Sequence, residues 1–204
     1  MREQPFFLVI DTETTGLFDF SRPADAPGQP RLASFAMLAC THELELVAAT
    51  SVLIKPDGWE MPAEASRIHG LSQELLLRHG APVQEVLWRY AEEIRWGSVI
   101  AGHNVDYDAK VLRGEFRRAG MPDLFEETRT FCTMRGLTDV CRIPKVSGRG
   151  YKWPRLSEAV RHCLGRDHAN AHGALPDAMA CLDLLRWMKA QGFAIRPARE
   201  PVHA

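Results

Sequence analysis

The alternation of apolar and polar positions begins with a run that predicts a buried strand. Residues Phe6 to Ile10 are all apolar, which is typical of a strand covered on both faces. Two carboxylates, Asp11 and Glu13, follow directly. Because successive side chains of a strand point to opposite faces, these two lie side by side at the end of the strand. Such a pair is unfavourable unless a positive charge lies between the two groups, and a plain polar strand end is the alternative interpretation.

Later segments follow either the short period of strands or the longer period of helices. The pattern predicts strands over 31–40, 44–56 and 98–104, and helices within 62–72 and over 81–97, 108–120, 130–144, 156–164 and 176–191. A short polar turn joins the first two of these strands, so they form an antiparallel meander with the opening strand. A fifth strand is expected between Glu126 and Met134. This order predicts an α/β fold with a mixed central sheet, in which the meander is combined with parallel strands and flanked by helices.

Length and composition are those of one globular domain. At 204 residues and 22.9 kDa, the chain can bury a substantial core without metal or disulfide support. We expect a single domain over 1–192 and a loosely held tail over 193–204, which has two prolines and little apolar content. The stretch 18–30, rich in Pro, Asp and Gly, predicts a surface loop.

Charge and cysteine content argue against several classes of protein. The 25 Lys and Arg residues are balanced by 26 Asp and Glu residues, so there is no basic field to hold long duplex nucleic acid. This charge balance is still compatible with an enzyme that binds the end of a nucleic acid strand through metal ions. Five cysteines without a CxxC pair argue against a zinc ribbon and predict a reduced, cytoplasmic protein. The N-terminus has the pattern of neither a signal peptide nor a membrane span.

Further carboxylates occur at the start of two predicted helices. Asp106 and Asp108 follow the strand over 98–104, where negative charge is favourable beside the helix dipole, and an N-cap role is the favoured interpretation of Asp106. Asp177 falls in the first turn of the last helix, five residues after His172. A lone histidine beside a loop carries little information. The combination of three acidic segments predicts a divalent metal site, since hard cations select carboxylate oxygens.

Three motifs resemble those of the DEDDh group of 3′-to-5′ exonucleases, which belong to the DnaQ-like family with a ribonuclease H-like fold. The motifs are "DTETTG" at 11–16, "HNVDYD" at 103–108 and "HGALPD" at 172–177. Within the second motif the resemblance selects Asp108 and leaves Asp106 as a neighbour. Within the third it selects His172 and Asp177 and leaves His168 out.

The resemblance extends over nearly the whole chain, from Phe6 to Lys189. It includes "IHGL" at 68–71, which is similar to the family's segment beside the substrate end. Two departures stand out: the loop over 18–30 is longer than the family usually has, and Pro176 immediately precedes the last acid. Neither departure removes a ligand, but the proline affects where the last helix begins.

The resemblance implies a two-metal site for phosphodiester hydrolysis. It assigns to Asp11 the bridging of two divalent cations, Mg²⁺ or Mn²⁺, about 3.5 to 4 Å apart. It assigns to Glu13 and Asp177 the cation that activates a water molecule, and to Asp108 the support of the other cation through water. His172 is then the base that accepts the proton of that water near neutral pH. These five residues are the implied catalytic set, and its four acids are the implied metal ligands.

A surface for the terminal nucleotide is also implied beside the acids. It comprises Thr14, Thr15, Gly16, Leu17, His69 and Leu71. Backbone amides and the missing side chain at Gly16 allow a nucleotide to approach closely. His69 and Leu71 are placed to stack or wedge near the last bases, although Leu71 is equally well explained as a core residue.

An aromatic residue among cations marks a second candidate surface for nucleic acid. The cations around Trp153 are Lys145, Arg149, Lys152 and Arg155. This mixture suits single-stranded nucleic acid through stacking and phosphate contacts, and a solvated loop with an anchoring Trp has the same pattern. By contrast, Trp88 and Trp96 lie on a helical stripe and are expected in the core.

The function implied by the resemblance is a metal-dependent 3′-5′ exonuclease. It releases nucleoside 5′-monophosphates from the 3′ end of single-stranded or frayed DNA. One alternative is an exoribonuclease that trims short RNA, because the motifs do not distinguish ribose from deoxyribose. Another is a proofreading or binding subunit of a DNA polymerase assembly, for which the 15 residues after Lys189 leave little room. No membrane association is expected, and the sequence leaves homodimerisation open.

Overall fold

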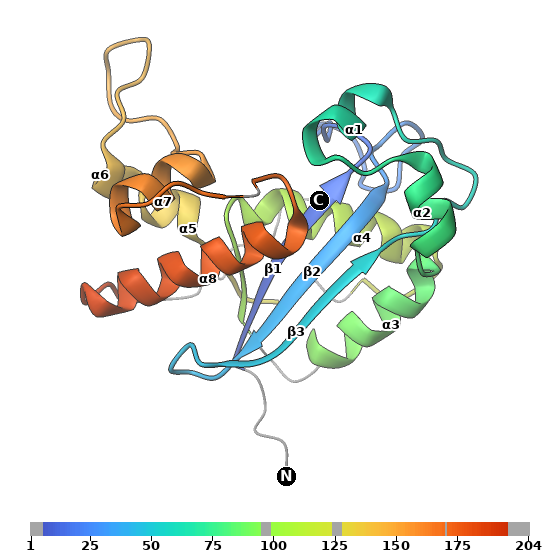
Figure 1. The fold of residues 1–204 in the computed structure, drawn as a ribbon, viewed down its shortest axis with the longest axis horizontal. Helices are drawn as coiled ribbons and strands as arrows, with labels where there is room; N and C mark the ends of the chain where they lie inside the picture. Colours follow the sequence, from blue (N-terminus) through green and yellow to red (C-terminus); the bar gives the residue numbers. More distant parts are fainter. Residues whose placement is uncertain (1–5, 95–98, 124–127, 170, 196–204) are drawn as a thin grey trace.

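The fold is built on one five-stranded sheet with strand order β3-β2-β1-β4-β5 (Figure 1). The structure is a computed structural model that describes residues 6–94, 99–123, 128–169 and 171–195. The strands are β1 (Phe7–Thr14), β2 (Leu32–Cys40), β3 (Leu46–Leu53), β4 (Val99–Gly102) and β5 (Thr130–Cys132). β1, β2 and β3 pair antiparallel, whereas β4 pairs in parallel with both β1 and β5. The predicted mixed sheet is therefore confirmed.

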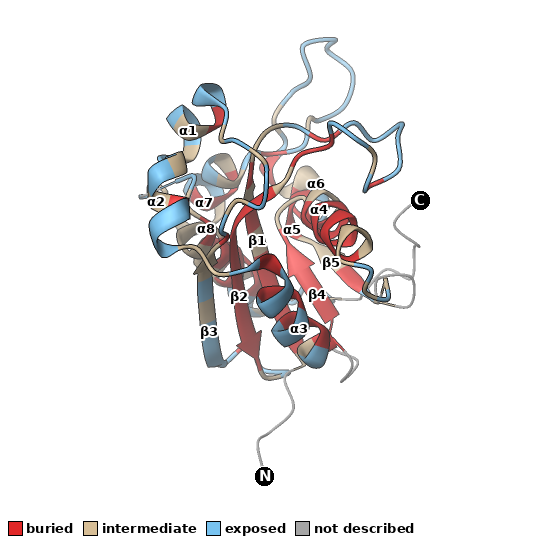
Figure 2. Ribbon diagram, turned by 90° about the vertical axis from the view of Figure 1, so that its right-hand side faces the viewer, coloured by how far each residue is buried: buried red, intermediate tan, exposed pale blue. Residues whose placement is uncertain are grey.

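Helices cover both faces of this sheet. They are α1 (Ala63–His69), α2 (Gln73–His79), α3 (Val83–Ile94), α4 (Val105–Arg118), α5 (Thr133–Gly136), α6 (Thr138–Cys141), α7 (Leu156–Leu164) and α8 (Ala174–Ala190). α8 crosses one face, where it packs against β1 and β2 (Figure 1). α3 and α4 lie on the other face of the sheet. α1 and α2 lie beside the end of the sheet that points upward in Figure 1. The strands between these layers are almost entirely buried, apart from the exposed β3 (Figure 2).

Strict alternation along β1 divides its side chains between the two layers. Leu8 and Ile10 are fully buried in the cluster formed with α3 and α4. Phe7 and Val9 are buried in the cluster formed with α8. Because the alternation continues past the apolar run, the odd-numbered residues that follow also face the α8 layer.

Several element boundaries differ from the sequence prediction. β1 continues to Thr14, so the two acids lie within the strand and not after it. α4 begins at Val105 and α8 at Ala174, each slightly earlier than expected. The prediction of a helix over 130–144 was wrong for its first residues. Residues 130–132 form β5, and the short helices α5 and α6 follow. Pairing with β4 overrides helical periodicity there, and it supplies the expected fifth strand.

Two further differences concern α2 and Trp88. The sequence analysis did not predict α2, yet Ser72 caps this helix by accepting a hydrogen bond from the backbone N–H of Leu75. Trp88 on α3 is 53% exposed, so the expectation of a core position was wrong. Trp96 and the tail from residue 196 onward lie outside the described residues.

The long loop over 18–30 is held against α4. Gly114 makes this contact close: a Cβ there would lie 2.5 Å from the carbonyl oxygen of Ala24. Gln29 is buried and donates hydrogen bonds to loop carbonyls, including that of Asp19 at 2.7 Å. The loop is thus ordered by its own polar contacts, and it forms one wall beside the end of β1.

Candidate active site

Three carboxylates from two elements meet on the α8 face of the sheet. Asp11 and Glu13 lie on that face by the alternation of β1, and Asp177 lies in the first turn of α8. One oxygen from each of the three lies within 4.8 Å of the others. Pro176 is tolerated in that first turn because its missing N–H has no intrahelical partner there. The predicted grouping of these acids is therefore what the fold produces.

Asp108 reaches the same strand from the opposite layer. α4 starts directly after β4 because Asn104 adopts a left-handed conformation (φ 77), which asparagine tolerates better than most residues. Asp108 is buried, and its Oδ1 accepts hydrogen bonds from the backbone N–H of Thr12 (3.0 Å) and from Thr12 Oγ1 (2.7 Å). Its carboxylate is thus held at β1 beside the cluster of three, with the second oxygen not engaged by Thr12.

Burial and acidic neighbours disfavour the charged forms of Asp11, Glu13 and Asp108. Burial raises the pKa of Asp11 well above its usual range, and the neighbouring charges of Asp108, Asp177 and Glu13 raise it further. Burial, followed by the charges of Asp177 and Asp108, raises the pKa of Glu13 to about 7. Burial also raises the pKa of Asp108, against the opposing effect of its hydrogen bonds from Thr12. An all-oxygen set of this charge fits a hard divalent cation, which would relieve the repulsion.

A pH dependence of stability follows for the metal-free protein. The folded state holds the Glu13 proton up to about pH 7, whereas an ordinary glutamate has a pKa of 4.5. Between these values the folded state binds more protons than the unfolded state, so the free energy of unfolding falls as pH rises. The Glu13 contribution is about 3.5 kcal/mol at most, from roughly 1.4 kcal/mol per pKa unit. Chemical denaturation in EDTA at pH 5 to 8 measures this slope.

The matched variant for this measurement is Glu13→Gln. It removes the titrating group, so its stability should fall less between pH 5 and 7.5 than that of the wild type. Saturating Mg²⁺ should reverse the wild-type trend, because metal binding requires the deprotonated carboxylates. Equal slopes for Glu13→Gln and wild type in EDTA would contradict the assignment.

His172 lies on the loop that leads into α8. It is exposed, and its backbone is left-handed (φ 68), a conformation that few residues with a side chain adopt. His69, at the end of α1, lies close enough that the charge of His172 lowers its pKa, in addition to the larger effect of burial. The two histidines therefore lie near each other. The role of His172 as a base stays a prediction.

A second histidine, which the motif comparison left out, contacts the acidic cluster directly. The His168 side chain is 3% exposed, and its Nε2 lies 2.6 Å from Oδ1 of Asp177. One oxygen of Asp177, Oδ1, is thereby engaged by His168. The spacing between His168 and Asp177 matches the period of neither a helix nor a strand. The sequence pattern therefore could not predict this contact.

We expect His168 to orient Asp177 for metal binding. His168→Ala should weaken Mn²⁺ affinity about 10- to 100-fold, the range found for groups that hydrogen-bond a metal ligand. His168→Gln retains an N–H donor and should recover part of the loss. Calorimetric titration with Mn²⁺ measures this without any cleavage assay. His162→Ala, at an exposed position of α7, is the control; affinity in His168→Ala equal to this control would rule the role out.

The predicted nucleotide-binding segment after the acids is held by α4. Tyr107 Oη donates to the carbonyl oxygen of Gly16 (2.7 Å) and lies 2.6 Å from Thr14 Oγ1. Thr14 Oγ1 also lies 2.8 Å from that carbonyl, and the two hydroxyl protons are shared among these three contacts. The Thr14 hydroxyl is thus engaged within the protein. No heavy atom lies within 4 Å of a Cβ placed at Gly16, so its surface is open.

The other predicted substrate residues differ in how far they face solvent. Leu17 is 93% exposed, whereas His69 and Leu71 are half-buried. The backbone N–H of Leu71 donates to Nδ1 of His69 (3.2 Å), so Nε2 carries the proton and donates to the carbonyl oxygen of Thr14 (3.2 Å). Thr15 Oγ1 accepts from the backbone N–H of Arg31 (2.8 Å). These contacts fix the segment and leave Leu17 as its exposed side chain.

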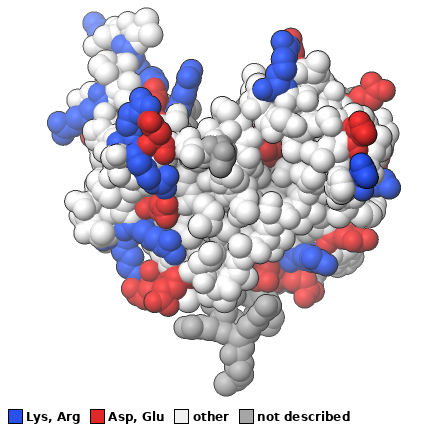
Figure 3. Space-filling model, in the orientation of Figure 1, with Lys and Arg blue, Asp and Glu red and all other residues white. Residues whose placement is uncertain are grey.

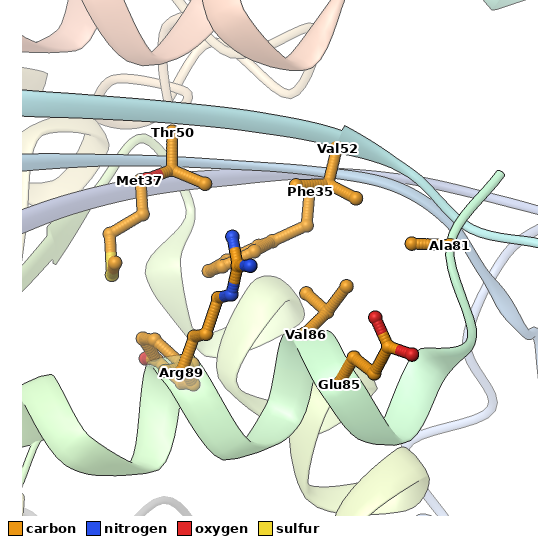
Figure 4. Close-up of a pocket in the computed structure, with 9 residues that line it drawn as sticks. Phe35, Met37, Thr50, Val52, Ala81, Glu85, Val86 and Arg89 are labelled. Atoms are coloured by element: carbon orange, nitrogen blue, oxygen red, sulfur yellow. The ribbon is translucent and has the colours of Figure 1, made fainter. Parts of the chain in front are cut away.

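Two cavities outside the acidic cluster differ in what they can hold. A small, partly open pocket of about 70 Å³ lies between the sheet and α3, where Arg89 and Glu85 flank Phe35 and Val86 (Figure 4). It has room for roughly two water molecules at about 30 Å³ each, so it cannot hold a nucleotide. An open cleft of about 560 Å³ lies beside the segment 15–17, between the long loop and Trp59. Its size is that of ligand clefts in general.

The fold and site together define a class of protein. A model of the RNase_T family, described as exonuclease, matches residues 8–185, and the chain belongs to this family. The resemblance to DnaQ-like exonucleases with a ribonuclease H-like fold is thus confirmed. None of the helices in the described part of the chain has the length and apolar character needed to cross a bilayer.

The chain is also similar to individual exonucleases. The chain is 28% identical over 200 residues to an uncharacterized exonuclease, CP81, of Escherichia phage 186, with 92% of this chain and 90% of the relative covered. It superposes on E. coli Exonuclease I in complex with a dT13 oligonucleotide with a TM-score of 0.74 at 21% identity, covering 90% of this chain. Exonuclease I from Methylocaldum szegediense gives a TM-score of 0.69 at 22% identity over 91% of this chain. The chain spans 40% of the length of each of these two structures.

Proposed function

We propose that this exonuclease hydrolyses the terminal phosphodiester bond at the 3′ end of single-stranded or frayed DNA. Nucleoside 5′-monophosphates are the products. The observation that carries the proposal is the meeting of Asp11, Glu13 and Asp177 within 4.8 Å. Asp108 lies beside them on Thr12, and the exposed His172 lies five residues before Asp177. This is a constellation of the DEDDh type.

The residues have distinct roles in the proposed reaction. Asp11, Glu13 and Asp177 would hold two divalent cations, Mg²⁺ or Mn²⁺, and Asp108 would support them. When bound, such cations lower the pKa of a water molecule and neutralise charge on the departing 3′ oxygen. His172 accepts the proton of the attacking water, and its exposure lets the proton pass on to solvent.

The terminal nucleotide occupies the surface formed by the segment 14–17, with the half-buried His69 and Leu71 at its side. The network of Tyr107 with the carbonyl oxygen of Gly16 holds this surface rigid, which favours correct placement of the scissile phosphate. The exposed Leu17 offers an apolar face to the terminal base. These contacts explain how a chain without net positive charge can engage a short end of nucleic acid.

DNA is favoured over RNA because the structural neighbours include E. coli Exonuclease I bound to oligonucleotides described as dT13 and dA16. Trimming of short RNA is the second candidate, since none of the site contacts described above reads a 2′ hydroxyl. A proofreading or binding role within a polymerase assembly, or a homodimer, draws no specific support from the site.

The test is a gel assay with 5′-labelled single-stranded DNA and an RNA of the same sequence, in Mg²⁺, in Mn²⁺ and in EDTA. We expect a ladder that shortens from the 3′ end of the DNA and disappears in EDTA. A ladder on RNA alone would support the second candidate. No cleavage of either strand with any metal would overturn the proposal.

A further inference from the structure

A basic arm extends from the body of the protein next to the candidate site. We define the basic arm as residues 143–155, between α6 and α7. The stretch from Arg142 to Ser157 contains no acid, and its cations are Arg142, Lys145, Arg149, Lys152 and Arg155. In a chain whose net charge is −1, this is a strong local concentration of positive charge. The exonuclease chemistry described above makes no use of it.

The arm has a defined backbone conformation although it extends into solvent (Figure 1). Pro144 and Tyr151 form an antiparallel bridge, and the backbone N–H of Lys152 donates to the carbonyl oxygen of Ile143 (2.8 Å). At its tip, the N–H of Gly148 donates to the carbonyl oxygen of Lys145 (2.9 Å). The arm therefore forms a hairpin-like turn, and its backbone hydrogen bonds fix the positions from which its side chains project.

A half-buried histidine ties the base of the arm to the end of β4, next to β1. His103, directly after β4, donates from Nε2 to the carbonyl oxygen of Pro154 (2.9 Å). Its Nδ1 accepts from Thr133 Oγ1 (2.9 Å), so the ring is held at both nitrogens. β4 pairs with β1, which carries Asp11 and Glu13, so His103 connects the base of the arm to the strand next to the cluster. Trp153 immediately precedes Pro154 and is 60% exposed.

The cations of the arm are largely free to bind an external anion. Within the described residues, Lys152 pairs with Glu158 (2.6 Å), whereas no carboxylate lies within 4.0 Å of Lys145, Arg149 or Arg155. Figure 3 shows Lys and Arg side chains gathered over this part of the molecule, on one side of a hollow in the surface. Exposed cations beside an exposed tryptophan suit a flexible polyanion with stacking bases.

We infer that the basic arm binds the nucleotides on the 5′ side of the 3′-terminal nucleotide in a single-stranded substrate. Lys145 and Arg149 contact backbone phosphates, and Trp153 stacks on a base close to the site. This inference rests on the proposed function, since it assigns the path by which the strand leaves the acidic cluster. It predicts that the arm contributes to long substrates and contributes nothing to a substrate of one nucleotide.

Two variants of the arm and two matched controls test this path. The charge variant is Lys145→Ala/Arg149→Ala, and its control, Lys55→Ala/Arg78→Ala, removes two exposed cations from another surface. The aromatic variant is Trp153→Ala, and its control is Trp88→Ala, at a tryptophan that is 53% exposed. Fluorescence anisotropy with a labelled 20-nucleotide oligo(dT) in EDTA measures binding without cleavage, over a series of salt concentrations. Hydrolysis of p-nitrophenyl thymidine 5′-phosphate in Mn²⁺ separately reports on the metal site.

Trp153→Ala should weaken binding of the 20-mer about 5- to 100-fold, the range for loss of one stacked base. The charge variant should lower the slope of log affinity against log salt by about 1.4, or roughly 0.7 for each lost phosphate contact. Both should hydrolyse the nitrophenyl ester like wild type. Affinity and salt slope equal to those of the controls would overturn the arm's role and leave the proposed function intact. Absence of ester and oligonucleotide hydrolysis by wild type would instead overturn the proposed function, while the binding series still decides on the arm.

Discussion

Asp11→Ala is expected to abolish both catalysis and metal binding. Asp11 is central to the cluster, since Glu13, Asp108 and Asp177 all raise its pKa through their charges. Metal ions supply several kcal/mol of transition-state stabilisation, and each 1.4 kcal/mol corresponds to about tenfold in rate. We therefore expect kcat/KM on single-stranded DNA to fall by roughly 10³-fold or more. Steady-state cleavage and Mn²⁺ calorimetry on the same preparations measure the two effects.

The isosteric variant Asp11→Asn separates loss of the ligand from loss of the fold. It removes a charge that the metal-free site disfavours, so its melting temperature in EDTA should equal or exceed that of wild type. Addition of Mg²⁺ should raise the melting temperature of the wild type and leave that of Asp11→Asn almost unchanged. If Asp11→Asn retained wild-type turnover, the metal site would have to be placed elsewhere.

Replacement of His172 is expected to lower turnover strongly while metal binding survives. General-base catalysis by a positioned side chain contributes about 10²- to 10⁴-fold, so kcat should fall within that range in His172→Ala. The left-handed backbone at His172 (φ 68) makes His172→Asn the cleaner variant, because alanine adds a backbone cost of about 1 kcal/mol there. Single-turnover cleavage beside Mn²⁺ calorimetry gives both quantities.

His79→Asn is the matched control for this experiment, because it changes an exposed histidine at the end of α2 by the same substitution. It should cleave like wild type. Addition of imidazole to His172→Ala should recover part of the lost rate, since a free base can then reach the exposed position. An unchanged kcat in His172→Asn would remove His172 from the reaction, and the neighbouring His69 would be the next candidate.

The sequence predicted those parts of the site that depend on strand alternation and helix starts. The side-by-side placement of Asp11 and Glu13 follows from the period of a strand and needs no tertiary information. Asp177 falls in the first turn of α8 as expected, although Pro176 left the start of that helix uncertain by two residues. The mixed sheet follows from the order of the elements.

The contacts made by tertiary packing could not be predicted in this way. The hydrogen bonds from Thr12 to Asp108 join residues 96 positions apart in the sequence. Thr12 lies in β1, whereas Asp108 lies in α4. The contact of His168 with Asp177 depends on how the loop before α8 folds back. β5 is only three residues long, so its pairing with β4, and not its own pattern, makes it a strand.

The division of β1 between two layers has a consequence for biosynthesis. Asp11 and Glu13 are near the start of the chain, whereas Asp177 arrives with α8, the last helix of the described residues. Until α8 has left the ribosome, the growing chain lacks the helix that covers one face of the sheet. It also lacks Asp177, one of the three clustered acids. N-terminal segments begin to fold during synthesis, so such a chain can already have its β-meander. We therefore expect nuclease activity to appear only after α8 has been synthesised and has packed against the sheet, so a chain that lacks α8 is harmless to the nucleic acids around it.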